Sequence, residues 1–212
     1  DLSYISGKLW EPGDVKYIDL DGNKVIDRGD NRLVDGDMGD QTIIGNTTPR
    51  YQYTFNGYIS WKGLSLSVMF QGVGKRDWVA GGAYFWGFGP YAQVTVFKEH
   101  MDYWRPDNPG AYYPKPYINS AGGVAPYQDK NIQRTDLYLQ NAAYCRLKNL
   151  TLSYDLPNAW VHKAGLQKVQ VFFSGENLLT FTKLKGMFDP EAIFSSNSYT
   201  SEGGKNYPMN RV

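Results

Sequence analysis

The sequence has few of the residues on which most enzymes and disulfide-rich proteins depend. It contains one cysteine, Cys145, and two histidines, His100 and His162, which lie far apart among its 212 residues. One cysteine excludes an internal disulfide framework, and inside a predicted strand we expect it to pack as a small side chain. G-x-S-x-G, H-E-x-x-H, phosphate-loop and dinucleotide motifs are all absent. Asp189 and Glu191 are interpreted as a turn rather than as a catalytic pair, so we expect no enzyme.

Long apolar runs and a strong net charge are absent as well. No run approaches the roughly 18 apolar residues of a transmembrane helix, so the sequence excludes such a helix. The formal net charge of +1 gives no electrostatic reason to expect a nucleic-acid partner. Membrane-spanning β-strands are not excluded, because they alternate apolar and polar residues and their average hydropathy is low.

Aromatic residues and glycine, by contrast, are abundant. The chain has 17 Tyr, 10 Phe, 6 Trp and 23 Gly, a composition that favours an all-β protein. The clearest strand is predicted at residues 143–156, where apolar and polar residues alternate strictly from Leu150 onward. About 14 residues exceeds both the usual length of a strand in a soluble protein, roughly five or six, and the roughly 9–11 residues that cross a bilayer.

Three further segments alternate in the same way, at residues 51–61, 64–70 and 168–181. Lys62-Gly63 separates the first two and predicts a two-residue hairpin turn. In the strand at 143–156, Leu147 is out of phase with Leu150, which predicts a bulge near Lys148-Asn149. A short helical turn that ends at Gly165 is expected between the last two strands.

The connections between these strands differ greatly in length. Residues 62–63 and 157–167 are short connections, whereas residues 1–50, 74–142 and 182–212 are long. A long unbroken connection is unusual in a compact soluble domain, but outer-membrane barrels alternate short periplasmic turns with long extracellular loops. Within the longest connection we expect one short helix at residues 95–104.

Oxygen-bearing residues recur between residues 19 and 30 with the spacing of a calcium loop of the EF-hand or dockerin kind. The expected ligands are Asp19, Asp21, Asn23, the backbone carbonyl of Val25, Asp27 and Asp30. Lys24 stands where such loops usually have glycine, and Asp30 stands where they usually have glutamate. We expect a structural Ca²⁺ here; the alternative is a polar turn without metal.

Aromatic residues are concentrated in the long connection at 74–142. Such rings stack on sugars or contact a partner protein, but they also pack a long ordered loop. The candidates for substrate or partner contact are Trp78, Trp86, Trp104, Tyr112 and Tyr113.

Seven segments together resemble the SusC/RagA family of TonB-dependent outer-membrane transporters. They follow in family order at residues 12–27, 44–51, 70–72, 103–109, 144–157, 175–183 and 186–191. In that family the calcium-like loop usually has glycine at the place of Lys24, and leucine is more usual at the place of Cys145.

The resemblance implies a 22-stranded antiparallel transmembrane barrel with an N-terminal plug, of which this chain provides C-terminal strands and long extracellular loops. It also implies a TonB contact through an N-terminal part absent here, and a SusD-type surface lipoprotein that covers the barrel as a lid. The ligand would be an oligosaccharide or a peptide. We expect the chain to be a piece of a longer protein that is embedded in the outer-membrane lipid of a Gram-negative bacterium and held by the rest of its own barrel.

On this interpretation the chain has five regions. They are an extracellular loop region with the calcium-like loop (1–50), a barrel hairpin (51–73), a long extracellular loop (74–142), two barrel strands joined by a short periplasmic turn (143–181), and an extracellular loop that leads to a final strand absent from the chain (182–212). The alternative function is a secreted, soluble, calcium-stabilised β-sandwich that binds carbohydrate, but such a sandwich has short connections throughout.

Overall fold

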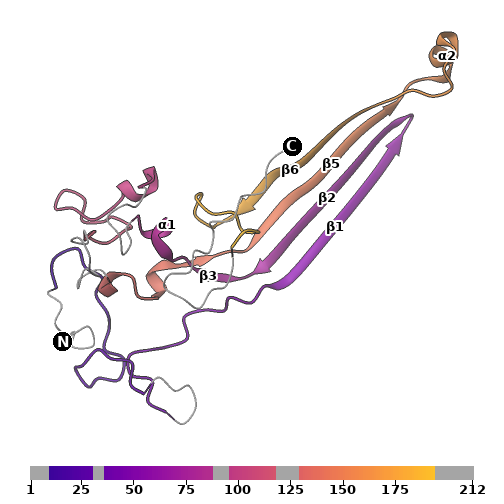
Figure 1. Ribbon diagram of the computed structural model, residues 1–212. Helices are drawn as coiled ribbons and strands as arrows, with labels where there is room; N and C mark the ends of the chain where they lie inside the picture. Colours follow the sequence, from indigo (N-terminus) through magenta and orange to yellow (C-terminus); the bar gives the residue numbers. More distant parts are fainter. Residues whose placement is uncertain (1–9, 31–35, 88–95, 118–128, 194–212) are drawn as a thin grey trace. The chain divides into compact units, whose positions relative to one another are not determined.

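The computed structural model describes residues 10–30, 36–87, 96–117 and 129–193 (Figure 1). The chain divides into two compact units. Unit 1 comprises residues 1–45, 79–139 and 196–203, and unit 2 comprises residues 46–78, 140–195 and 204–212. Among the described residues, no helix is long and apolar enough to cross a membrane.

Unit 2 is built on a four-stranded sheet with the order β1-β2-β5-β6. Its strands are β1 (Arg50–Trp61), β2 (Leu64–Lys75), β5 (Tyr144–Asp155) and β6 (Gln170–Thr182). Every neighbouring pair is antiparallel, and Figure 1 shows the four strands side by side. Strands occur where the alternating pattern predicts them, and the prediction of an all-β, antiparallel fold is confirmed. Each strand has 12 or 13 residues, enough to cross a bilayer when tilted.

Two local features of the sheet follow from its sequence. Lys62 and Gly63 have φ values of 48° and 86°, the pair of positive φ angles that a type I′ hairpin turn requires. The ladder between β5 and β6 shifts register between Leu147 and Asn149, so the bulge predicted there is confirmed. The bulge keeps the apolar residues on either side of it on one face.

The two faces of the sheet differ in polarity, because residues paired across neighbouring strands point to the same side. One face carries mainly apolar rows across the four strands, and the other carries mainly polar and charged side chains. Two apolar rows are Ile59–Leu66–Leu152–Phe173 and Trp61–Leu64–Tyr154–Val171. A polar row is Tyr58–Ser67–Thr151–Ser174, and a second, Ser60–Ser65–Ser153–Phe172, has one apolar member.

Short elements complete the described part of the chain. They are β3 (Asp77–Val79) and β4 (Leu139–Asn141), which pair with each other, the helices α1 (Gly82–Trp86) and α2 (Asn158–Val161), and the 3-10 turns η2 (Lys98–Met101), η3 (Asp129–Asn131), η4 (Asp136–Tyr138) and η5 (His162–Ala164). Gly165, with φ of 74°, ends α2 and η5 as predicted.

The prediction of a helix at residues 95–104 is wrong for residues 96–104, which the structure describes. Only the single turn η2 forms there, and Thr95 lies outside the described residues. The chain leaves the helical conformation at Asp102, whose φ and ψ are −84° and 56°. Trp104 then donates its backbone N–H to Tyr113, 2.9 Å away, so the segment pairs with a distant part of the loop instead of with itself.

Candidate functional site

An aromatic cluster forms the core of unit 1. Phe85 is fully buried, and its ring centroid lies 4.7 Å from that of Trp86, 5.4 Å from that of Tyr113 and 6.0 Å from that of Tyr138. Tyr112 lies 5.0 Å from Tyr113 in an edge-to-face arrangement. Such contacts add to the stabilisation that burial of the rings already provides, so α1 is fixed to residues 112–113 and 138.

Burial also affects the hydroxyl groups of this cluster. It raises the pKa of Tyr112 to about 12, and it raises the pKa of Tyr113 and of Tyr138 further above the ordinary tyrosine range. The cause is that a phenolate loses most of its hydration inside the cluster. These tyrosines therefore stay neutral at physiological pH and act as packing and hydrogen-bonding groups.

The five aromatic residues predicted for ligand or partner contact separate into different places. Trp86, Tyr112 and Tyr113 come together in the core of unit 1. Trp78 belongs to unit 2, where its ring lies 4.7 Å from that of Phe188. Trp78, Trp86 and Tyr113 are buried, whereas Tyr112 and Trp104 are partly exposed. The buried rings fit the alternative that the sequence left open, the packing of a long ordered loop, and direct contact stays a prediction for the exposed ones.

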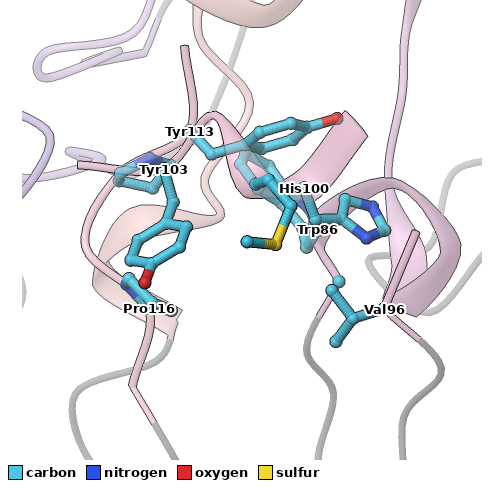
Figure 2. A pocket seen from close by; sticks show the side chains of 9 residues that line it. Trp86, Val96, His100, Tyr103, Tyr113 and Pro116 are labelled. Carbon is cyan, nitrogen blue, oxygen red and sulfur yellow. The ribbon is translucent and has the colours of Figure 1, made fainter. Parts of the chain in front are cut away.

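Beside the aromatic cluster lies an apolar cavity of about 150 Å³ (Figure 2). Its lining residues are Trp86, Gly87, Val96, His100, Met101, Tyr103, Tyr113, Pro114 and Pro116. In Figure 2, Tyr103 and Pro116 lie together on one side, and Trp86, Tyr113 and His100 lie on the other. Val96 and Met101 are both 58% exposed, so solvent reaches the rim.

His100 has a structural role in this cavity wall. Its Nδ1 accepts a hydrogen bond from the backbone N–H of Phe97 at 3.0 Å, and its Nε2 lies 3.0 Å and 3.1 Å from the carbonyl oxygens of Tyr84 and Phe85. This arrangement places the ring proton on Nε2. Both ring nitrogens are therefore used within the fold, and the residue holds η2 against α1.

The acidic loop of unit 1 brings together a set of carboxylates different from the predicted one. Ligand atoms of Asp19, Asp21 and Asp40 all lie within 4.8 Å of one another. Asp40 is new to this set: its carboxylate accepts hydrogen bonds from the backbone N–H groups of Leu20 and Asp27 at 2.5 Å and 2.8 Å. Twenty residues separate Asp40 from Leu20, so no spacing rule based on a single loop would find it.

The other predicted ligands of this loop make local hydrogen bonds. The side-chain oxygen of Asn23 accepts the N–H of Val25 at 2.6 Å, and Asp27 Oδ1 accepts the N–H of Gly29 at 2.7 Å. Asp27 and Asp30 do not belong to the group of three carboxylates. The carboxylates of Asp19, Asp21 and Asp40 supply hard oxygen ligands of the kind that Ca²⁺ prefers.

Lys24 adopts the backbone conformation that this kind of loop requires. Its φ is 68°, in the left-handed region where glycine usually stands. Its N–H donates to Asp19 Oδ2 at 2.9 Å, and the N–H of Gly22 donates to Asp19 Oδ1 at 2.7 Å. Burial would raise the pKa of Asp19, but these N–H groups outweigh it and hold that pKa below its usual value. The lysine therefore does not prevent the loop from turning.

A buried ion pair joins two distant segments of unit 1. Lys130 is fully buried, and its Nζ lies 2.5 Å from Oδ2 of Asp14. Asp14 Oδ1 also accepts hydrogen bonds from Asn131 at 2.9 Å and from Tyr117 at 2.8 Å. Burial alone would raise the pKa of Asp14, but these donors outweigh it and hold that pKa below its usual value. The carboxylate is thus ionised and fully surrounded by donors.

A second cluster of charges, in unit 2, fixes the chain after β6. Arg146, on β5, donates to Thr180 Oγ1 at 2.8 Å, to Glu191 Oε2 at 2.8 Å and to Asp189 Oδ2 at 2.7 Å. Lys148 contacts Glu191 at 3.1 Å. The guanidinium is almost completely buried. Asp189 and Glu191 lie in a turn, as predicted, but their partner Arg146 was not predicted, because more than forty residues separate them.

Comparison with known proteins gives two curated relatives in Formosa agariphila. TonB-dependent receptor P3 is 31% identical over 188 residues, which cover 89% of this chain and 16% of the relative. TonB-dependent receptor P26 is 25% identical over 181 residues, which cover 84% of this chain and 16% of the relative. The chain therefore spans about a sixth of the length of these receptors. No family model matches the chain.

Solved structures of the RagAB peptide importer are also similar to this chain. The 'closed-closed' state has a TM-score of 0.49 and 30% identity, over 76% of this chain and 16% of the importer chain. The 'open-open' state has a TM-score of 0.47 and 27% identity, over 76% of this chain and 17% of the importer chain.

Proposed function

We propose that this chain is a segment of a TonB-dependent transporter of the SusC/RagA type, and that it forms barrel wall and surface loops of a nutrient importer in the outer membrane of a Gram-negative bacterium. The observation that carries the proposal is the exposed apolar face of the four-stranded sheet. Phe55, Ile59, Trp61, Val171 and Phe173 are each at least 60% exposed on that face. A soluble protein would cover such a face, whereas a barrel turns it toward lipid.

The dimensions of the apolar face fit a bilayer. Its rows run from Tyr53 to Trp61, eight residue steps along β1, or about 27 Å at roughly 3.4 Å per step. A strand tilted by about 40° would give this face a height of about 21 Å, close to the roughly 25 Å apolar band of outer-membrane barrels. Aromatic rings stand at both ends of the face: Tyr53 and Phe181 share one row, and Trp61 and Tyr154 share another.

The rest of the barrel would lie outside this chain. Four strands cannot close a barrel, so β1 and β6 would pair with further strands of a 22-stranded wall around an N-terminal plug. TonB would act through that absent part and supply the work of transport, with no chemistry on the ligand. The short connections would face the periplasm, and the long ones, including unit 1, would face the outside.

We assign ligand or lid contact to the partly exposed aromatic residues of unit 1. Tyr112 and Trp104 are partly exposed, and the apolar cavity opens nearby through Val96 and Met101. A SusD-type lipoprotein would cover this side of the transporter, and the ligand would be an oligosaccharide or a peptide. The acidic loop would hold a structural Ca²⁺ through Asp19, Asp21 and Asp40, and this ion would fix the conformation of the loop.

Uptake by the intact transporter tests this function. Fluorescent oligosaccharides and peptides are offered to cells with the wild-type gene, with the gene deleted, and with TonB inactivated. We expect uptake of one ligand class that requires both the transporter and TonB. Replacing Trp104, which lies outside the aromatic cluster, with alanine should lower that uptake, whereas Leu137→Ala, an exposed apolar change elsewhere in unit 1, should not. Uptake of neither class, or uptake that persists without TonB, would refute the function.

A further inference from the structure

The connection at residues 157–169, between β5 and β6, carries two large apolar side chains that are exposed on this chain. Trp160, in α2, is 66% exposed, and Leu166 is 52% exposed. The backbone N–H of Leu166 donates to the carbonyl of Val161 at 3.2 Å, so Leu166 is held next to the helix that carries Trp160. We call this connection the 157–169 turn.

The 157–169 turn lies beyond the end of the apolar face of the sheet. The row nearest to it is Trp61–Leu64–Tyr154–Val171, and Figure 1 shows α2 beyond the ends of β5 and β6. Three residues, about 10 Å of extended chain, lead from Tyr154 to Pro157. With a strand tilt of about 40° this is a height of about 8 Å, close to the roughly 5–8 Å thickness of one headgroup layer. The helix therefore begins within about one headgroup layer of the end of the apolar face.

The charge of the turn is of one sign. Residues 156–169 include His162, Lys163 and Lys168 and no acidic residue. The neighbouring hairpin turn adds Lys62, whose Nζ lies 4.9 Å from the ring centre of the exposed Trp61. Lys168 contacts Asp155 at 3.2 Å, but its side chain is still 66% exposed. Exposed tryptophan with lysine around it is the combination that favours the boundary between acyl chains and phosphate groups.

We propose that the 157–169 turn is an interfacial anchor: α2 lies in the lipid headgroup layer at the end of the barrel that bears the short connections, with Trp160 and Leu166 toward the acyl chains. Lys163 and its basic neighbours face the lipid phosphates. The inference rests on the proposed function, because it requires that the apolar face of the sheet meets lipid. On this proposal the turn binds the phospholipid surface in addition to joining β5 to β6.

Site-directed spin labelling of the full-length transporter in vesicles of phosphatidylcholine and phosphatidylglycerol tests the anchor. In a background without other reactive cysteines, single cysteines at Leu152, Ser153 and Leu166 carry the label. The ratio of accessibility to oxygen over that to a polar nickel complex then reports depth. We expect a high ratio at Leu152, a low ratio at Ser153, and an intermediate ratio at Leu166.

A matched pair of substitutions identifies the anchoring side chain. In the Leu166-labelled protein, Trp160→Ala should lower the ratio toward that of Ser153, whereas Asn158→Ala, an exposed change in the same turn, should leave it unchanged. The label at Leu152 in the Trp160→Ala variant verifies that the barrel itself is still inserted.

The possible failures have distinct signatures. A low ratio at Leu152 would mean that the apolar face does not meet lipid, and the proposed function would then fail. A high ratio at Leu152 together with a low ratio at Leu166 would overturn the anchor alone. Protection of Leu166 from both reagents would indicate contact with protein, and a ratio equal to that at Leu152 would place the turn in the hydrocarbon. Both results would also overturn it.

Discussion

Arginine at position 152 should destabilise the inserted barrel, whereas arginine at the adjacent position 153 should have little effect. Leu152 lies in the apolar row with Ile59 and Phe173, and 41% of it is exposed on this chain. Ser153 lies in the row with Ser60 and Ser65 on the opposite face. The two substitutions introduce the same side chain one residue apart, so strand propensity and net charge are matched, and they differ only in the face that receives the charge.

The expected magnitude follows from the depth of Leu152. An arginine on the lipid face costs about 2–4 kcal/mol at the midplane of the bilayer and about 0–1 kcal/mol near its surfaces. Leu152 is one row away from the middle of the apolar face, at Gly57, and one row away from the end, at Trp61. We therefore expect a loss of about 2 kcal/mol, which corresponds to about a 30-fold change in the folding equilibrium.

Urea unfolding of the intact transporter in phospholipid vesicles measures this difference. The folded fraction is followed by the altered gel mobility of the unheated barrel and by tryptophan fluorescence. Leu152→Ala and Ser153→Ala provide the baseline for loss of each original side chain. Equal destabilisation by arginine at both positions, or a larger effect at Ser153, would refute the assignment of the two faces.

Three further predictions concern the loops. Calorimetry of the intact protein should show a rise in Tm on addition of Ca²⁺, and Asp40→Asn should reduce that rise. Asp136→Asn, an exposed change outside the carboxylate group, should preserve the rise. A wild-type Tm that does not respond to Ca²⁺ would refute the site. Asp14→Asn leaves the charge of Lys130 buried without its counter-ion and should cost about 3–5 kcal/mol near neutral pH. Because the folded-state pKa of Asp14 is lowered, the stability that its ionisation contributes is present above the unfolded pKa and is lost as pH falls through the folded pKa, so urea titrations of wild type and variant should converge in acid and stay apart at pH 7. Arg146→Gln should expose residues 183–193 to limited proteolysis, whereas the unchanged cleavage of this segment would show that the charge cluster does not hold it.

Much of the sheet could be predicted from sequence, because its determinants are local. Alternation with a period of two marks each strand, Lys62-Gly63 matches a two-residue turn, and the phase error between Leu147 and Leu150 locates the bulge. The same alternation also predicts which residues share each face of the sheet. None of these features requires knowledge of what the distant parts of the chain do.

The loops were harder to predict, because distant residues fix them. Asp40 joins Asp19 and Asp21 through backbone groups that only the folded chain brings near. The helix expected at residues 95–104 does not form beyond one turn, because the backbone N–H of Trp104 bonds to the carbonyl of Tyr113 instead. Aromatic residues in a long loop gave no indication of which rings would form the core, because ring size and hydrophobicity are the same for a buried Trp86 and for a ring that binds a ligand.

Both units hold their long connections with buried charges as well as with apolar packing. Lys130 with Asp14, and Arg146 with Asp189 and Glu191, are each nearly inaccessible to solvent. A buried ion pair contributes little net stability when an apolar packing of the same shape would serve. It does, however, penalise every arrangement in which one partner is buried without the other, by several kcal/mol, so one loop geometry is selected over its neighbours. Replacing Arg146 and both of its acidic partners with apolar residues of similar size should therefore preserve the free energy of unfolding in urea. The loop should, however, adopt a broader set of conformations. Double electron–electron resonance between labels on β5 and on residues 183–193 measures this as a broader distance distribution. A narrow distance distribution in that triple variant would show that apolar packing alone specifies the loop.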